Sequence, residues 1–347
     1  MSKVYFKALD CACNLTKVSA AAAELLAKFV DSESIKLGEV IPLKVHFGEK
    51  GNKTYLKPDN YFGIIDYLKS NGIKSSYMET SVLYGGERFE RERHIKLALN
   101  HNFTQLPIVI ADGANGEDAT EIEINQRHFK SASIAKDLAA AEQVLVLSHF
   151  KGHRLAGFGG ALKQLSMGFA SKGGKMAMHM GVKPRVKRFK CKNCRLCLKR
   201  CQVEAISIVD KKAQINHEKC IGCGACFSIC PHKAISIYSL NGIWNALFRG
   251  RFFREKLMEY ALASHKGKNN IYLTFAINIT RGCDCEPYPM KPCVNNIGLL
   301  ISLDPVAIDS AAYDLTARQG RKFKGHEQLA YAEKIGVGSC KYELITI

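Results

Sequence analysis

The segment VLVLSHFKGHRLAGFGGALKQLSMGFASKGGKMAMH, residues 144–179, decides the fold. It opens with an uninterrupted apolar run that ends at about Ser148 and is typical of a strand buried on both faces. A loop rich in glycine and basic residues leads from this run into a second run with the three-to-four spacing of a helix. A buried strand that continues into a helix is the repeating unit of a parallel sheet covered by helices.

The same alternation extends along the chain on both sides of this segment. Apolar runs predict strands at residues 3–9, 41–47, 73–80, 106–112, 142–150, 270–278, 297–303 and 342–347. Helical spacing predicts helices at residues 17–30, 60–72, 88–101, 131–141, 252–265 and 304–318. We therefore predict an α/β fold, with a mostly parallel sheet covered by helices.

The pattern is interrupted near Met180 by an insertion that contains an internal repeat. The stretches CKNCRLCLKRCQVEAISI and CIGCGACFSICPHKAISI align with an offset of 29 residues, from Cys191 to Cys220. Both show C-x2-C-x2-C-x3-C spacing, which is typical of 4Fe-4S ligation, whereas a zinc site or structural thiols are the alternatives. The predicted domains are a host α/β domain at residues 1–182 and 239–347 and an inserted α+β domain at residues 183–238.

This repeat closely resembles the bacterial two-cluster ferredoxins. In that family the fourth cysteine of each motif ligates the other cluster, so the resemblance implies two sets of four ligands. They are Cys191, Cys194, Cys197 and Cys230 for one 4Fe-4S cluster and Cys220, Cys223, Cys226 and Cys201 for the other. The chain departs from the pattern at Gln202, where the family has a proline, and keeps that proline at Pro231. The insertion is expected to carry electrons, with a purely structural role as the alternative.

Basic side chains gather where two predicted strands end. They are Lys44 and His46 at the first strand end, Lys151 and His153 at the second, and Lys163 in the helix that follows. Ligands in parallel sheets bind outside the carboxyl ends of the strands, so these five are our catalytic candidates in a cleft for an anionic substrate or cofactor. An ordinary basic surface loop is the alternative.

Three glycines, Gly157, Gly159 and Gly160, precede the helix of Lys163. A glycine-rich entry to a helix leaves backbone N–H groups free to bind an anion, and we predict that role for these residues. Their spacing is not the dinucleotide fingerprint G-x-G-x-x-G, so no dinucleotide is implied.

A second cysteine-rich stretch, ITRGCDCEPYPMKPC at residues 279–293, follows a predicted strand. Cys283, Cys285 and Cys293 could hold a third 4Fe-4S cluster with one open iron, or a zinc ion with an open position. Cys11 and Cys13 could supply a further thiolate. Inert or reversibly oxidised thiols are the alternative.

Four segments of the host are similar to the iron–sulphur-associated family called domain of unknown function 362. They are LKVHFGEKGN (43–52), HFKGHRLAGFGGALKQLSMGFASKGGK (149–175), CDC (283–285) and LLISLDPVAIDSAAYDL (299–315). The resemblance implies the architecture, including a ferredoxin insert, but no particular substrate.

The composition of the chain predicts where the protein is located in the cell and what kind of partners it binds. Fourteen cysteines, mostly at short spacing behind an amino terminus without an apolar run, predict a cytoplasmic protein with metal-bound thiols and no membrane span. The net charge of +18 favours acidic partners: an electron-donor or acceptor protein, an anionic small molecule, or a nucleic acid, although no nucleic-acid-binding motif is present. The residues argue neither for nor against a flavin.

Three functions follow from these features. The first is an iron–sulphur oxidoreductase that passes low-potential electrons through the insertion to a substrate in the host cleft. The second is an electron carrier or partner subunit without its own catalysis. The third is a cluster-dependent sulphur-transfer or RNA-modifying enzyme.

Overall fold

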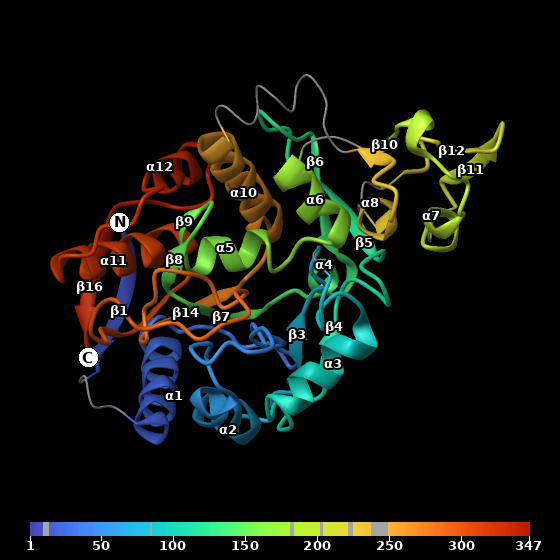
Figure 1. Ribbon diagram of the computed structural model, residues 1–347. Helices are drawn as coiled ribbons and strands as arrows, with labels where there is room; N and C mark the ends of the chain where they lie inside the picture. The colour runs from blue at the N-terminus through green and yellow to red at the C-terminus, as the bar shows by residue number, and fades with distance from the viewer. Residues whose placement is uncertain (10–13, 84, 181–183, 202–203, 221–224, 237–248) are drawn as a thin grey trace.

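The computed structural model describes residues 1–9, 14–83, 85–180, 184–201, 204–220, 225–236 and 249–347 (Figure 1). The centre of the host is an eight-stranded sheet. Its strands, from edge to edge, are β16 (Tyr342–Thr346), β1 (Ser2–Ala8), β15 (Gly298–Ser302), β14 (Ile271–Ala276), β7 (Leu145–His149), β2 (Leu43–Lys44), β3 (Tyr77–Glu79) and β4 (Ile108–Ile110).

Most neighbouring strands of this sheet are parallel. Within the sheet β15 alone runs against its neighbours, β1 and β14, while the other adjacent pairs are parallel. The predicted α/β fold with a mostly parallel sheet is therefore confirmed. The direction of β15 was not foreseen, because a fully apolar run reads the same in a parallel or an antiparallel strand.

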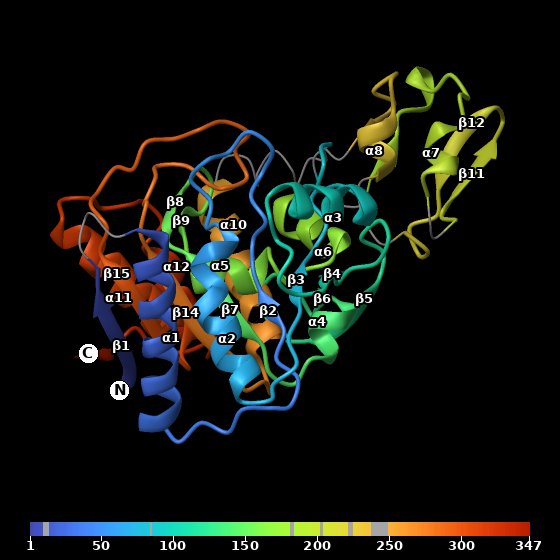
Figure 2. The same cartoon turned by 90° about the horizontal axis from the view of Figure 1, so that it is seen from below.

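Helices cover both faces of the sheet (Figures 1 and 2). One layer contains α1 (Leu15–Ser32) and α2 (Phe62–Ser70), with α3 (Arg91–Asn100) beside β4. The other contains α5 (Ala161–Ser166), α6 (Lys172–Met180), α10 (Arg249–His265), α11 (Pro305–Arg318) and α12 (Glu327–Lys334). Shorter elements are η1 (Pro58–Tyr61), α4 (Lys136–Ala140), and the hairpins β5 (Ala119–Glu123) with β6 (Ser131–Ala135) and β8 (Lys151–His153) with β9 (Gly157–Gly159).

Successive residues of the central strands enter two different hydrophobic cores. Leu145 and Leu147 of β7 pack under α1 and α2, while Val146 packs on the opposite face with residues of α5, α10 and α11. All three are at most 1% exposed, and each such side chain stabilises the fold by about 1.5–3 kcal/mol. Burial on both faces explains why these strands are apolar throughout.

The prediction of a helix over residues 131–141 is wrong for its first half. Ser131–Ala135 forms strand β6, and the helix α4 begins only at Lys136. In β6, Ala132 and Ile134 are buried while Ser131 and Ser133 are half-buried, so the alternation has the period of a strand.

A small domain, formed by residues 184–201, 204–220 and 225–236, projects from the host beside α3 and α6 (Figures 1 and 2). Its elements are β10 (Arg185–Val186), η2 (Arg188–Lys190), α7 (Leu196–Lys199), β11 (Ile206–Val209), β12 (Lys212–Ile215), α8 (Ala225–Ile229) and β13 (Ile235–Ser236). β10 pairs with β13 and β11 with β12, both antiparallel. The start of α7 and the start of α8 lie 29 residues apart, as do those of β11 and β13, so the sequence repeat is also a structural repeat.

None of the helices in the described ranges is both long enough and apolar enough to cross a bilayer.

Candidate functional site

The carboxyl ends of the parallel strands meet at one edge of the host sheet, and two adjoining cavities lie there. The first cavity, of about 40 Å³, is lined by Lys151, Cys283 and Asp284 among others. The second cavity, of about 130 Å³, is lined by Arg88, Lys175 and Cys285 among others. His46, Lys163 and Gln164 line both. The structure thus brings together His46, Lys151, His153 and Lys163 of the five predicted catalytic residues.

The fifth, Lys44, lies outside both linings and is fully buried in a network of charges. Its Nζ donates to Glu79 Oε1 at 2.7 Å, and Arg88 Nη1 lies 3.6 Å from the other Glu79 oxygen. Arg88 Nε also donates to Glu49 Oε2 at 3.1 Å. Burial alone would raise the pKa of Glu79, but Lys44 and its neighbours hold it well below the ordinary value. Lys44 therefore supports Glu79, which does line the second cavity, and its catalytic role stays a prediction.

His46 faces donors on both sides of its ring. Its Nδ1 accepts the Gly48 N–H at 3.0 Å, and its Nε2 lies 2.9 Å from Arg88 Nη1. Burial, followed by the charge of Arg88, lowers the pKa of His46 to about 3. His46 is therefore neutral at physiological pH and does not supply an imidazolium proton there.

Asp284, between the two cysteines of CDC, is the acceptor in a second network of charged hydrogen bonds and is only 1% exposed. Lys151 donates to Asp284 Oδ2, and His149 Nδ1 lies 3.0 Å from the same oxygen. The other ring nitrogen of His149 lies 2.8 Å from the carbonyl oxygen of Ile277. Burial alone would raise the pKa of Asp284, but Lys151 and His149 hold it well below its ordinary value. The charge of Lys151 is therefore already neutralised by an internal partner.

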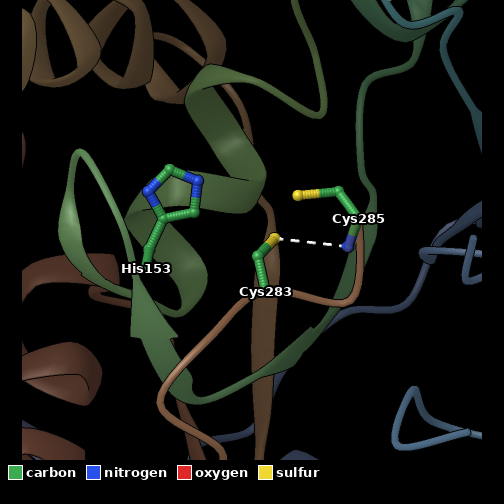
Figure 3. Close-up of side chains that lie close together, drawn as sticks. All are labelled: His153, Cys283 and Cys285. Atoms are coloured by element: carbon green, nitrogen blue, oxygen red, sulfur yellow. Dashed lines mark hydrogen bonds between the residues drawn. The ribbon is translucent and has the colours of Figure 1, made fainter. Parts of the chain in front are cut away.

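His153, Cys283 and Cys285 form the group that is compact enough for a single metal ion within the described ranges (Figure 3). One ligand atom from each lies within 4.8 Å of the others. Lys163 Nζ lies 3.9 Å from Cys283 Sγ, and the Cys285 N–H donates to that sulphur at 3.5 Å. A hydrogen bond from Cys285, together with Lys163 and His153, holds the pKa of Cys283 well below its ordinary value despite burial, while the pKa of Cys285 is raised by the same pairing.

Cys293, the third predicted ligand in this loop, is not a member of that group. Its N–H donates to the Ile279 carbonyl oxygen at 2.7 Å, next to an isolated bridge between Thr280 and Pro292. The half-buried side chain packs against the larger host core. Cys11 and Cys13 lie outside the described residues. His153 was assigned as a catalytic residue from the sequence, but no spacing pattern connects it to the distant CDC motif.

The helix that follows the glycine segment binds a carboxylate of the protein itself at its first N–H groups. The N–H groups of Ala161 and Leu162, at the start of α5, donate to the two carboxylate oxygens of Asp309 at 2.7 and 3.0 Å. Burial raises the pKa of Asp309 to about 7. A protein carboxylate thus accepts the N–H groups of Ala161 and Leu162, and the cofactor-binding role of Gly157, Gly159 and Gly160 stays a prediction.

The three glycines instead permit close packing. Gly157 has φ of +87°, and a Cβ there would lie 1.9 Å from the Lys324 carbonyl oxygen. A Cβ at Gly160 would lie 2.2 Å from Asp309 Oδ1, and one at Gly159 would lie 2.7 Å from Lys163 Cδ. The glycines therefore set the position of β9 and α5, and through α5 the position of Lys163.

Lys175, from α6, is a cation of the second cavity that contacts neutral oxygens. Its Nζ donates to Thr80 Oγ1 and to the Ala170 carbonyl oxygen, both at 2.7 Å. Burial lowers the pKa of Lys175 to about 8. This lysine is therefore poised to change charge just above neutral pH.

In the small domain, four cysteines line one further cavity. They are Cys191, Cys194, Cys197 and Cys230. The N–H of Ala205 donates to Cys201 Sγ at 3.2 Å and that of Ala234 to Cys230 Sγ at 3.3 Å, so the two halves of the repeat share the same N–H···S contact. Cys226 is buried and Cys220 half-buried, while Cys223, like Gln202, lies outside the described residues.

Comparisons with known proteins place the chain in a family. Residues 41–314 match the family model described as "Domain of unknown function (DUF362)". No curated protein matches the chain. Solved structures similar to it include a protein from Thermotoga maritima (11% identity, TM-score 0.45) and the lactate racemase apoprotein from Thermoanaerobacterium thermosaccharolyticum (12% identity, TM-score 0.37).

The two solved proteins are longer than this chain. The alignments cover 90% and 80% of this chain but only 60% and 51% of those proteins, respectively. The family model, by contrast, matches a continuous range that runs from β2 to α11 and includes the small domain. The chain therefore belongs to the DUF362 family, as its sequence segments indicated.

Proposed function

We propose that this protein is an iron–sulphur reductase. In this proposal, the small domain holds two 4Fe-4S clusters and supplies electrons to an anionic small molecule bound in the second cavity of the host. One observation carries the proposal: Cys191, Cys194 and Cys197 line a single cavity with Cys230, which comes from the other half of the repeat.

That arrangement fits the ligand set expected for one cluster. The fourth cysteine of each half reaches across to the other half in two-cluster ferredoxins, as Cys230 does in this cavity. The N–H···S bonds to Cys201 and Cys230 are of the kind that tunes cluster potentials. When bound, such clusters accept and release single electrons.

A contact between the small domain and the host supports an electron path toward the second cavity. Arg200, next to Cys201, forms an ion pair with Glu90 and lies 5.0 Å from the ring centroid of Phe89. Phe89 is adjacent to Arg88, which lines the second cavity. Lys172 Nζ lies 3.7 Å from the Phe89 ring centroid as well, so the ring contacts cations of both domains.

The distribution of charge supports an anionic ligand. Lys44, Arg88 and Lys151 each form ion pairs with host carboxylates. Lys163 and Lys175 line the second cavity, and neither forms a carboxylate ion pair within the described ranges. These two lysines are therefore the residues that would hold the anionic groups of the ligand.

Two side chains would handle protons in this cavity. Lys175, with a pKa of about 8, is charged at neutral pH and can donate a proton. Burial favours the neutral form that remains after the donation. His153 accepts backbone N–H groups at Nδ1, so its hydrogen lies on Nε2 and is available as a donor toward the site.

The first test is an anaerobic count of iron and acid-labile sulphide. We expect about eight irons per chain, and about four fewer after either Cys191→Ser or Cys220→Ser. Cys340→Ser, which changes a half-buried host cysteine, is the matched control and should leave the count unchanged. A count near zero in the anaerobically prepared protein would contradict the proposal.

A second test separates a reductase from an electron carrier. The dithionite-reduced protein is mixed with small anionic oxidants, such as sulphite and nitrite, and with cytochrome c as a protein acceptor. The double variant Lys163→Met with Lys175→Met should lose oxidation by the anions and keep oxidation by cytochrome c. Lys322→Met, at an exposed host position, is the control for loss of charge. Equal rates for the wild type and the double variant with every oxidant would favour the carrier.

A further inference from the structure

Three hydrogen-bond donors converge on the sulphur of Cys283, which is only 3% exposed. Lys163 Nζ lies 3.9 Å away, and the backbone N–H of Cys285 lies 3.5 Å away. The third is the Nε2 side of the His153 ring, which faces the two cysteines in Figure 3. A sulphur with three donors and no carboxylate contact is in a setting that favours the thiolate, the reactive form of cysteine.

The hydrogen bonds of His153 argue against a metal ion at this group. Its Nδ1 accepts the N–H groups of Leu155 at 3.2 Å and Ala156 at 2.9 Å, so the hydrogen of the neutral ring lies on Nε2. A histidine that binds a metal through one nitrogen donates from the other. Here the other nitrogen accepts, so Nε2 is a donor to sulphur and its lone pair is not free for a metal.

The second cysteine completes a pair of thiols. The sulphurs of Cys283 and Cys285 lie within 4.8 Å of each other, and each lines a different one of the two cavities. Lys163 lines both cavities, so one cation lies beside the pair and beside the space where a ligand would bind. Asp284, between the two cysteines, is tied to Lys151 and His149, which fixes the backbone from which both thiols extend.

From this geometry we infer that Cys283 and Cys285 are a redox-active dithiol that reduces a disulfide or persulphide bond in an anionic small molecule. This inference deepens the proposed function, on which it relies only for renewal of the dithiol. It replaces the third cluster or zinc ion that the spacing of Cys283, Cys285 and Cys293 predicts.

The reaction balances as two thiol–disulfide exchanges. The Cys283 thiolate attacks one sulphur of the substrate R–S–S–R′, which forms a mixed disulfide and releases R′–S⁻. The Cys285 thiol passes its proton to the departing R–S⁻ and attacks Cys283 Sγ, which forms the Cys283–Cys285 disulfide and releases R–SH. Two electrons from the small domain, with one proton, return the disulfide to the Cys283 thiolate and the Cys285 thiol.

The side chains around the cavity favour an anionic substrate over a neutral one. Lys163 and Lys175 carry the charge that ion pairs do not neutralise. The cavity of about 130 Å³ admits a small molecule, not a folded protein. The matched probes are therefore dithiodipropionate, an anionic disulfide, and hydroxyethyl disulfide, a neutral one of similar size.

The experiment uses the full-length protein with its clusters intact, first treated with dithiothreitol and then freed of it anaerobically. Each probe is added, unreacted thiols are alkylated, and the peptides are mapped by mass spectrometry. We expect a Cys283–Cys285 disulfide in the wild type, formed about tenfold faster with the anionic probe. Cys285→Ser should stop at a mixed disulfide on Cys283, and Cys283→Ser should not react in this loop. Cys293→Ser, in the same loop but outside the group, should behave as the wild type.

The inference fails if Cys283 stays unmodified in Cys285→Ser while the melting temperature of that variant shows that it is folded. It also fails if the wild type holds zinc or additional iron that both Cys283→Ser and Cys285→Ser lose. If Cys285→Ser does not fold, Cys285→Ala replaces it in the test for a mixed disulfide on Cys283. The disulfide map of the wild type then shows whether Cys283 and Cys285 pair. Because the first reduction of the disulfide probe uses no cluster, this test and the iron count can fail independently.

Discussion

The host cavities and the small domain differ in what holds them together. In the host, two extensive hydrophobic cores flank the sheet, and several charged residues at its edge, such as Lys44 and Lys151, pair with carboxylates. Among the described residues of the small domain, the buried cluster has seven members, and three of them are the cysteines Cys191, Cys197 and Cys226. The described residues of the host thus stabilise it by apolar packing and ion pairs, whereas in our proposal the clusters held by its cysteines would stabilise the small domain.

The largest expected effect tests this contrast directly. Removal of iron by an anaerobic chelator should unfold the small domain and leave the host folded, because the described part of the small domain buries few apolar side chains. Hydrogen exchange by mass spectrometry should show loss of protection in residues 184–201, 204–220 and 225–236 and unchanged protection in β7 and β14. If the small domain stayed protected from hydrogen exchange after complete loss of iron, the proposed difference in stability between the two domains would be contradicted.

The second-largest expected effect tests whether ion pairs stabilise the edge of the host sheet. Glu79→Ala leaves the cations of Lys44 and Arg88 buried without their shared partner. We expect the free energy of unfolding of the host to fall by about 3–5 kcal/mol, measured by urea denaturation. Glu343→Ala, at an exposed position on the edge strand β16, should change it by less than about 0.5 kcal/mol.

A smaller effect concerns the carboxylate that occupies the start of α5. Asp309→Ala removes the acceptor of two buried N–H groups and should lower the free energy of unfolding by about 1–3 kcal/mol at pH 8. The pKa is raised from 3.8 to about 7, so between these values the folded protein holds a proton that the unfolded chain has lost. Asp309 therefore makes the free energy of unfolding of the wild type fall as pH rises through that window. This part of the pH dependence should be absent in Asp309→Ala.

The smallest predicted effect concerns ligand binding alone. Because the pKa of Lys175 is lowered to about 8, this lysine is charged below that pH and neutral above it. Binding of dithiodipropionate, measured by calorimetry with Cys283→Ser to prevent reaction, should weaken as pH rises from 7 to 9. Adding Lys175→Met should flatten that dependence and weaken binding about threefold to tenfold at pH 7. An unchanged pH profile would show that Lys175 does not contact the ligand.

Sequence patterns predict the host sheet well because each strand is decided locally. An apolar run such as residues 144–147 predicts a strand that is buried on both faces, independently of which strands lie beside it. The hairpin of β8 and β9 was missed, because its short strands KGH and GFG contain little apolar sequence. Strand ends could be placed, and with them His46 and Lys151, since these residues directly follow the apolar runs.

The acidic residues of the site could not be predicted, because their partners are remote in the sequence. Asp284 contacts Lys151 across 133 positions, and Asp309 contacts Ala161 across 148. A sequence shows the basic residue and the glycines but not the carboxylate that packing brings to them. For the same reason, Lys44 and Lys163 look alike in the sequence, whereas one is neutralised in the core and the other lines the cavities.

The attachment of the small domain has a mechanical consequence for the second cavity. The chain leaves the host at the end of α6 and returns at the start of α10. His179 of α6 and Phe253 of α10 both line the second cavity, with ring centroids 4.9 Å apart. A force applied to the small domain would therefore act on the two helices that line this cavity.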